Sequence, residues 1–379
     1  MDEQNVAFKL AVGSLADASN EIYRRASDVF LPEDGVLDMS ANENPLGPSP
    51  LALAAVADVS GNFHCYPDSH GTALRVALAN QLGVDVGQLI LGNGSSELLD
   101  LIARATLAPG DQALIATPSF LPYRSAIQRA RGVIVQVPLT SDYCFDLDRM
   151  AEQIGRRTRL VILGHPNNPT GTILGTEEFD RFLDRLPDQA VVLVDEAYHD
   201  YVRRPDAADA IALLKNGRPV VAVRTFSKLH ALAGLRIGYA AAHPALAAQI
   251  ESLRPHYNTS SAAQAAALAC LADDDHIARS LSVNCTGLVA LSSGCADLGL
   301  EYVPSEANFL LVRTGNADDI TAAMKARCVL VKSGRPFGLP DHIRISVGTP
   351  ASNARCLKAL QCALNDYRIN NPINKHSKE

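Results

Sequence analysis

The sequence predicts an α/β protein, with a large domain built on a mostly parallel seven-stranded sheet flanked by helices and a smaller α+β domain. Two observations predict this fold. Short apolar runs alternate with helical patterns such as residues 176–186, and the runs lack polar alternation, which indicates strands buried on both faces of a sheet. The runs cover residues 88–91, 112–116, 132–137, 159–163, 190–194, 219–223 and 237–241.

After residue 244 the pattern changes to that of a smaller α+β domain. Alanine-rich helices are expected at 244–254 and 261–273, and a long helical pattern runs through the 280s. Short strands are expected at 300–303, 308–313, 328–332 and 342–346, before a closing helix at 350–367. We therefore assign 46–255 to the large domain, and 1–45 with 256–379 to an N-terminal arm plus a small C-terminal domain.

Composition excludes several classes of protein. Of 379 residues 47% are hydrophobic, which excludes disorder, and 34 Lys+Arg against 41 Asp+Glu give a net charge of −7 that disfavours nucleic acid as a partner. No apolar run approaches the ~20 residues that span a bilayer, and the first residues lack the pattern of a secretory signal. The eight cysteines form no Cys-x-x-Cys pair, so we expect packing thiols of a cytoplasmic protein and no metal site.

The segment Gly92 to Glu97 connects an expected strand to an expected helix that starts at Leu98. Its residues Gly94, Ser95 and Ser96 suit a phosphate site, because glycine allows close backbone approach and a helix N-terminus offers unpaired N–H groups. A plain turn with a serine cap is the alternative interpretation.

Two further polar motifs follow expected strands. Asn168 lies in the run from His165 to Gly171, and an Asn at the carboxyl end of a strand can hydrogen-bond a ligand. Asp195 and Tyr198 follow the strand at 190–194, where a buried carboxylate needs a cation to offset its desolvation. A simple turn and a surface salt bridge are the respective alternatives.

Basic residues complete the set. Lys228 lies among hydroxyl and apolar residues, and a lysine in a partly dry pocket can form a Schiff base with an aldehyde, although most lysines are solvated. Arg344 on an expected strand can hold a carboxylate or phosphate in two places, unless it forms a structural ion pair. Taken together, these groups match the needs of pyridoxal 5'-phosphate: a lysine for the aldehyde, an acid for the ring nitrogen and an anion site for the phosphate.

The order of these motifs resembles that of the fold-type-I pyridoxal-phosphate aminotransferases, in particular the histidinol-phosphate aminotransferase branch. The resemblance extends from about residue 38 to 365 and implies their fold, the PLP-dependent transferase fold type I. The segments that carry it are Asn42-Glu43-Asn44-Pro45, Tyr66-Pro67-Asp68, Asn167-Asn168-Pro169-Thr170-Gly171, Asp195-Glu196-Ala197-Tyr198, Ser227-Lys228 and Ala233-Gly234-Leu235-Arg236.

This resemblance implies a role for each matching residue. Lys228 would bind the cofactor aldehyde and move the substrate proton, Asp195 would pair with the ring nitrogen, and Tyr198 would act with Asn168 on the ring 3-oxygen. Phe120 would stack on the ring. The phosphate would be held by Gly94, Ser95, Ser96, Thr225, Ser227 and Arg236.

The substrate and partner residues follow from the same resemblance. Arg344 would bind the acidic end of the substrate, with Asn44 nearby, and Tyr66 would come from the partner subunit of a homodimer with shared sites. Lys332 stands where the branch commonly has an arginine, which leaves open whether the substrate is phosphorylated. His165 and His230 also depart from the branch, and for His230 plain packing is the favoured interpretation.

We therefore expect an aminotransferase of amino-acid biosynthesis that acts between an amino acid or amino phosphate and a 2-oxo acid such as 2-oxoglutarate. Histidinol phosphate, and hence histidine biosynthesis, is the first choice of donor, and aromatic amino acids are the second. Decarboxylation of a phosphorylated amino acid, as in threonine-phosphate decarboxylase relatives, is an alternative reaction. A non-catalytic PLP-binding sensor is disfavoured, because the short acidic start leaves no room for a DNA-binding domain.

Overall fold

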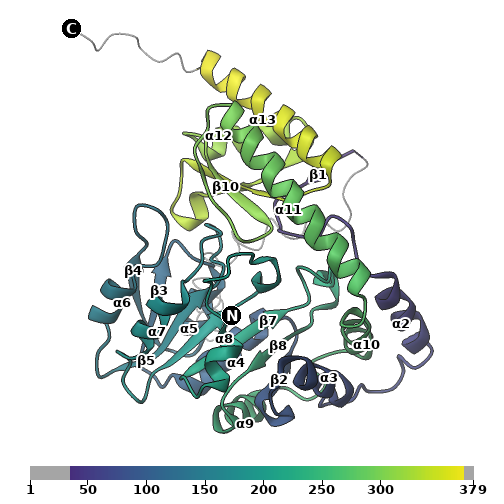
Figure 1. Cartoon of the computed structure of the whole chain (residues 1–379), viewed down its shortest axis with the longest axis vertical. Helices are drawn as coiled ribbons and strands as arrows, with labels where there is room; N and C mark the ends of the chain where they lie inside the picture. Colours follow the sequence, from purple (N-terminus) through teal and green to yellow (C-terminus); the bar gives the residue numbers. More distant parts are fainter. Residues whose placement is uncertain (1–34, 371–379) are drawn as a thin grey trace, which may run out of the picture.

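The computed structural model describes residues 35–370, and the rest of the expected N-terminal arm lies outside this range (Figure 1). A seven-stranded sheet with the order β2-β8-β7-β6-β5-β3-β4 forms the centre, and only β8 runs antiparallel to its neighbours. This confirms the predicted fold class. The strands are β2 (Leu89–Gly92), β3 (Gln112–Thr117), β4 (Val133–Pro138), β5 (Thr158–Gly164), β6 (Val191–Asp195), β7 (Val220–Thr225) and β8 (Gly238–Ala241).

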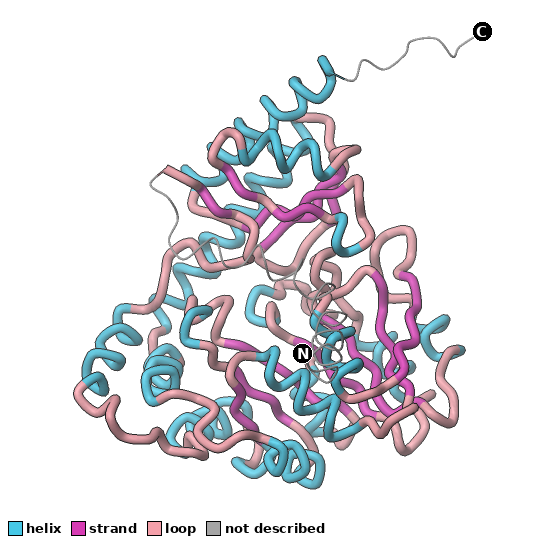
Figure 2. Tube along the Cα trace, turned by 180° about the vertical axis from the view of Figure 1, so that it is seen from behind, coloured by secondary structure: helices cyan, strands magenta, loops and turns pink. Residues whose placement is uncertain are grey.

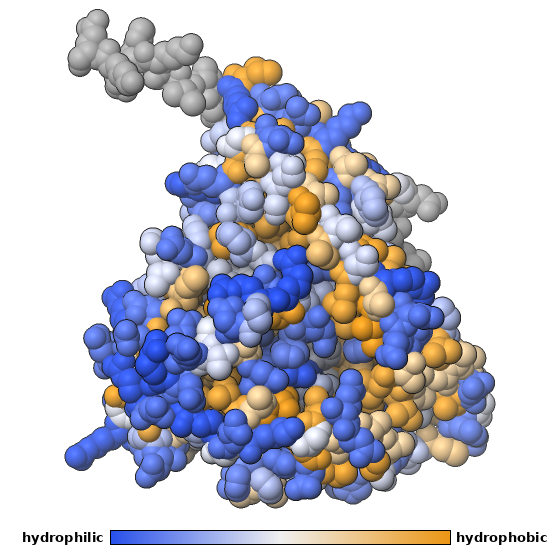
Figure 3. All heavy atoms as spheres, in the orientation of Figure 1, coloured by the Kyte–Doolittle hydropathy of each residue, from blue (hydrophilic) through white to orange (hydrophobic). Residues whose placement is uncertain are grey.

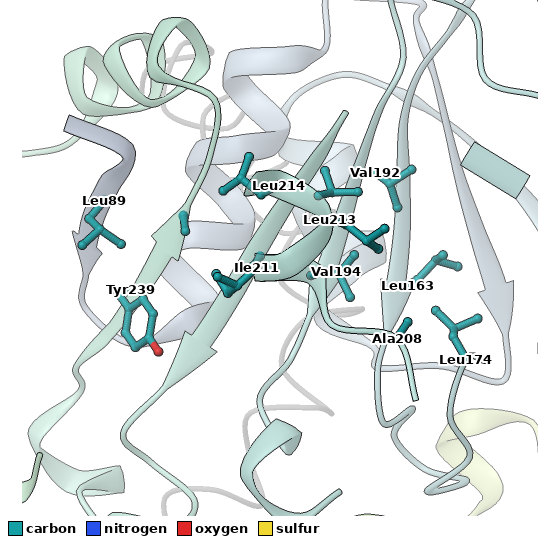
Figure 4. Packing of buried hydrophobic residues seen from close by; sticks show 14 of the residues in the cluster. Leu89, Leu163, Leu174, Val192, Val194, Ala208, Ile211, Leu213, Leu214 and Tyr239 are labelled. Atoms are coloured by element: carbon teal, nitrogen blue, oxygen red, sulfur yellow. The ribbon is translucent and has the colours of Figure 1, made fainter. Parts of the chain in front are cut away.

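Helices cover both faces of this sheet because successive strand residues point in opposite directions. In β6, Val192 and Val194 join one apolar cluster, part of which Figure 4 shows, while Leu193 joins the cluster on the other face. The first face packs against α2 (Pro50–Ser60), α3 (Thr72–Leu82), α6 (Leu147–Glu152), α7 (Thr176–Leu183), α8 (Ala210–Lys215) and α10 (Ser261–Cys270). The second packs against α4 (Ser95–Thr106), α5 (Pro122–Arg129) and α9 (Pro244–Leu253).

A second, antiparallel sheet with the order β12-β13-β10-β9 lies at one end of the large sheet (Figures 1 and 2). Its strands are β9 (Tyr302–Val303), β10 (Phe309–Arg313), β12 (Lys332–Ser333) and β13 (His342–Ser346). The helices α11 (Asp274–Asp297), α12 (Ala317–Lys325) and α13 (Pro350–Asn370) share an apolar cluster with Ile343 and Ile345 of β13. By alternation, His342, Arg344 and Ser346 occupy the opposite face of β13. No helix in residues 35–370 has the length and apolar content to cross a membrane.

Two sequence-based boundaries are corrected. The strand expected at 328–332 is divided into β11 (Val329–Leu330), which pairs in parallel with β1 (Leu37–Asp38), and β12, which pairs with β13. The chain passes from one sheet to the other at the buried Val331, and an apolar run carries no signal for such an exchange of partners. Helix α4 begins at Ser95 instead of Leu98, directly after Gly94, which has a left-handed φ of 75°.

Single 3-10 turns occur at Val86–Gln88, His199–Tyr201, Ala233–Leu235 and Arg335–Phe337.

Candidate active site

The carboxyl ends of three parallel strands bring the predicted residues together. Gly164 of β5 pairs with Asp195 at the end of β6, and Asp195 pairs with Val223 of β7. Asn168 follows β5, and Lys228 follows β7, so all three predicted groups emerge at one edge of the sheet. Open α/β sheets bind ligands at this edge.

Asp195 is a buried carboxylate with two hydrogen bonds. The hydroxyl of Tyr123 donates to its Oδ2 at 2.9 Å, and the backbone N–H of Ala197 donates to its Oδ1 at 3.2 Å. Burial raises the pKa of Asp195 to about 6, although both hydrogen bonds favour the charged form. A cationic ligand group beside Asp195 would offset this desolvation, which is the need that a protonated pyridine nitrogen meets.

Lys228 points toward the segment that precedes α2. Its Nζ donates to the carbonyl oxygens of Ala41 and Asn42, both at 3.1 Å, and lies 5.7 Å from the centre of the Tyr198 ring. Burial, with a contribution from the Arg344 charge, lowers the pKa of Lys228 to about 8. A large fraction of the amine is therefore neutral near pH 8, as a nucleophile for an aldehyde requires.

Arg344 is buried and retains a free donor. Its Nη1 donates to Oδ1 of Asn168 at 2.6 Å and its Nη2 to the carbonyl of Ser40 at 2.5 Å. Its guanidinium carbon lies 5.3 Å from the Phe309 ring centre and 5.9 Å from that of Phe337. Buried Nε of Arg344 has no hydrogen-bond partner among the described residues. An anionic substrate group would satisfy this donor.

An anion cradle lies at the N-terminus of α4. Gly94 precedes the helix without a side-chain cap, and a Cβ at this position would collide with the guanidinium of Arg236. Nη1 of Arg236 lies 3.4 Å from Oγ of Ser227, which accepts from the Thr225 hydroxyl at 2.9 Å. The cradle thus combines helix N–H groups, hydroxyls and one guanidinium, the donor set that a phosphate requires. Ser95 and Ser96 form the first turn of the helix.

Three other predicted residues, Phe120, Lys332 and Tyr66, lie at different places relative to Asp195 and Arg344. Phe120 is half-buried and its ring meets that of Tyr123 edge-on at 5.6 Å, which brings it to the Asp195 side. Lys332 is exposed and lies directly opposite Arg344 in the β12–β13 register, so both side chains share one face. Tyr66 is 82% exposed, and its ring stacks on that of Tyr257, which is not one of the predicted residues, with the ring centres 4.6 Å apart.

The side-chain amide of Asn44 forms hydrogen bonds to other residues of the chain. Its Nδ2 donates to the carbonyl of Leu229 at 2.7 Å and to Oγ of Ser280 at 2.9 Å, and its Oδ1 accepts from the N–H of Leu46 at 3.0 Å. The amide therefore holds the segment that follows Lys228.

The two unusual histidines are packed inside the protein. Leu174 N–H donates to Nδ1 of His165 at 2.9 Å, so the neutral ring carries its proton on Nε2, 2.9 Å from the carbonyl of Ala208. Burial lowers the pKa of His165, which favours this neutral form of the ring. His230 packs on Phe226 with ring centres 5.0 Å apart, and burial lowers its pKa too.

Sequence reasoning missed two residues of the site. Asn42 donates from Nδ2 to the Tyr198 hydroxyl at 2.9 Å, while its carbonyl accepts from Lys228, and it has a left-handed φ of 56° that asparagine tolerates. Its presence in the Asn42-Glu43-Asn44-Pro45 motif was a usable signal. Tyr123 offered no such signal, because only the fold brings its hydroxyl from α5 to Asp195.

This arrangement of acid, amine and anion cradle at the edge of a seven-stranded sheet is that of the pyridoxal-phosphate enzymes of fold type I. Residues 34–360 match the family model "Aminotransferase class I and II". The chain belongs to this family and is a pyridoxal-phosphate-dependent aminotransferase, as the sequence resemblance predicted.

Named relatives agree with this assignment. The chain is 38% identical to histidinol-phosphate aminotransferase of Akkermansia muciniphila over 90% of this chain and 93% of the relative. It is 42% identical to histidinol-phosphate aminotransferase 2 of Ralstonia nicotianae over 87% and 89% of the two chains. The structure of histidinol-phosphate aminotransferase from Sinorhizobium meliloti in complex with pyridoxal-5'-phosphate matches with a TM-score of 0.81 at 28% identity, over 88% and 91%.

A decarboxylase shares the fold. L-threonine-O-3-phosphate decarboxylase from Porphyromonas gingivalis matches with a TM-score of 0.76 at 24% identity, over 87% of this chain and all of that one. At this identity the match establishes the fold alone, so the reaction must be inferred from the family and the closer relatives.

Proposed function

We propose that this aminotransferase transfers the amino group of histidinol phosphate to a 2-oxo acid such as 2-oxoglutarate, a step of histidine biosynthesis. The observation that carries the proposal is the 38–42% identity to named histidinol-phosphate aminotransferases over nearly the full length of both chains. Arg344 supports it, because its buried Nε offers an unused donor to an anionic end group. Lys332 adds a second positive charge on the same face of the small sheet.

The residues of this chain would divide the reaction among them. Bound pyridoxal phosphate supplies an aldehyde and an electron-withdrawing ring that stabilises negative charge on the carbon bearing the amino group. Asp195 would keep the ring nitrogen protonated, and Asn168 and Tyr198 would form hydrogen bonds to the ring 3-oxygen. The cradle around Arg236 would hold the cofactor phosphate. Lys228, whose pKa is lowered to about 8, would accept and return the substrate proton as general base and acid.

A half-reaction screen tests the proposed substrate. Enzyme loaded with pyridoxal phosphate is mixed with one amino donor at a time, and the visible absorbance of the cofactor is followed. We expect histidinol phosphate to convert the cofactor at least about tenfold faster than histidinol, because removing the phosphate leaves the buried Nε of Arg344 unpaired. Phenylalanine and O-phosphothreonine serve as the other donors.

Three outcomes would overturn the proposal. Faster conversion by phenylalanine would identify an aromatic aminotransferase. Release of carbon dioxide from O-phosphothreonine would identify a decarboxylase. Absence of any spectral change with every donor would leave only a cofactor-binding sensor.

The enzyme is further proposed to act as a homodimer with shared sites. Tyr66 is 82% exposed, and other large apolar side chains are exposed on α2, on the segment after it and beside α10. In Figure 3 such side chains gather on the flank where α2 and α10 lie. These residues are Leu51, Leu53, Phe63, Tyr66, Tyr257 and Leu268. Contiguous apolar surface of this kind is typical of a protein interface.

Complementation between two inactive variants tests the shared site. Tyr66→Ala and Lys228→Ala chains are co-expressed with different tags, and the mixed dimers are isolated. If Tyr66 serves the site of its partner, each mixed dimer contains one intact site and recovers about half of the wild-type activity per dimer. Mixed dimers as inactive as either parent, or a monomer in sedimentation, would contradict the proposal.

A cytoplasmic location is proposed from the cysteines. All eight are free thiols in the structure. Burial raises the pKa values of Cys270, Cys295 and Cys356 to about 12, so these thiols are unreactive packing groups. Free thiols throughout the chain suit a reducing compartment.

A further inference from the structure

One face of β13 forms a row of hydrogen bonds to the rest of the protein. His342, Arg344 and Ser346 alternate with residues of the apolar cluster, so their side chains leave the small sheet on the side of the large domain. Arg344 donates to Asn168 at 2.6 Å, and Ser346 donates to Oδ1 of Asn42 at 3.0 Å. Both partners belong to the site, which makes the position of this strand important for the reaction.

The third member of the row, His342, bonds to a residue outside the described site. Its Nε2 lies 2.9 Å from the hydroxyl of Tyr143, on the loop between β4 and α6. Its Nδ1 lies 2.7 Å from a carboxylate oxygen of Asp341, which can only accept. Nδ1 therefore carries a proton, and in the neutral ring Nε2 accepts from Tyr143. His342 is 3% exposed, and the tyrosine that it bonds is half-buried.

Tyr143 is held firmly from the large-domain side. Its φ of 60° is left-handed, which is uncommon for a bulky residue and persists only where the surroundings determine it. Its carbonyl accepts from the Thr172 hydroxyl at 2.8 Å, and Thr172 Oγ1 lies 2.7 Å from that of Thr170. Thr170 in turn accepts from Asn167, the neighbour of Asn168. Tyr143 is thus anchored to the same loop that supplies Asn168.

We propose that Tyr143 and His342 form a positioning pair that aligns β13 with the loop after β5 and so aims Arg344 at the acidic end of the substrate. Both contacts lead to Asn168. Arg344 bonds Asn168 directly, and Tyr143 is bonded to the loop of Asn168 through Thr172 and Thr170. Neither residue touches the reacting atoms. The inference rests on the proposed role of Arg344 in substrate binding.

Kinetics of Tyr143→Phe test the pair, since this change removes one hydroxyl and keeps the ring. We expect the KM for the amino donor to rise about fivefold, as for the loss of one hydrogen bond, with kcat within about twofold of wild type. His342→Gln should keep KM near wild type, because its Oε1 can still accept from Tyr143. Tyr302→Phe is the matched control, since Tyr302 lines the same cavity of about 300 Å³ beside Tyr143 and His342.

A double-mutant cycle with Arg344→Lys separates this inference from the proposed function. If the pair acts through Arg344, adding Tyr143→Phe to Arg344→Lys raises KM by less than about twofold. A full fivefold increase there, or a normal KM for Tyr143→Phe alone, would overturn the positioning role. A fall of kcat together with stability would make the bond merely structural and overturn it as well. A normal KM for Arg344→Lys alone would instead refute the role of Arg344 in the proposed function.

Discussion

Replacement of Lys228 by alanine is expected to reduce transamination by more than about 10⁴-fold, because one change removes both the covalent attachment point and the general base. The amine lies 5.7 Å from the Tyr198 ring centre and has a pKa lowered to about 8, so it is suited to both tasks. Turnover and the visible absorbance of the bound cofactor measure the effect. The absorbance should change with the activity, since the aldehyde stays free in the variant.

Lys325→Ala is the matched control for this prediction. Lys325 is exposed in the last turn of α12, so its removal should leave both turnover and absorbance unchanged. A Lys228→Ala protein that retained the wild-type spectrum and measurable turnover would show that another amine holds the cofactor.

Asp195→Asn is expected to have opposite effects on activity and on the stability of the cofactor-free protein. Activity should fall by roughly 10²–10⁴-fold, because a neutral amide cannot keep the ring nitrogen protonated. The pKa of Asp195 is raised to about 6 from 3.8, so the folded state binds this proton more tightly than the unfolded state. Stability of the wild-type protein is therefore lost as the pH rises through this window, by about 3 kcal/mol in total.

Urea unfolding of the cofactor-free proteins at pH 5 and pH 8 measures the second effect. The free energy of unfolding of Asp195→Asn should exceed that of wild type by up to about 3 kcal/mol at pH 8, and by less at pH 5. Asp188→Asn, at an exposed position, should match wild type at both values. An Asp195→Asn protein less stable than wild type at pH 8 would mean that the carboxylate is stabilised by its surroundings.

The strands and the chemical groups were predictable from the sequence for physical reasons. Runs such as residues 160–163 are apolar throughout because both faces of β5 are covered, and this pattern is visible without any partner. Lys228, Asp195 and Arg344 were recognisable because amine, carboxylate and guanidinium in these contexts suit one cofactor. The proximity of Asp195 and Lys228 then followed from the parallel order of β6 and β7, whereas Arg344 comes from β13 of the second sheet.

What could not be predicted depends on contacts between distant segments. Asn42 and Asn44 belong to one motif, but only the fold shows that Asn42 reaches Tyr198 while Asn44 bonds to Leu229. The division of residues 328–332 depends on pairing with Leu37 and Asp38, nearly 300 positions away. Likewise, His342 bonds Tyr143 across 199 positions, and no pattern in the sequence links the two residues.

The central claim is that the amine at position 228 is the one that binds the cofactor. Reduction of the loaded enzyme with borohydride, followed by peptide mapping, identifies the modified lysine among the eight in the chain. We predict one modified residue per chain, Lys228, and loss of this modification in the presence of excess amino donor. Modification at Lys332 or at several surface lysines, with Lys228 unmodified, would contradict the account.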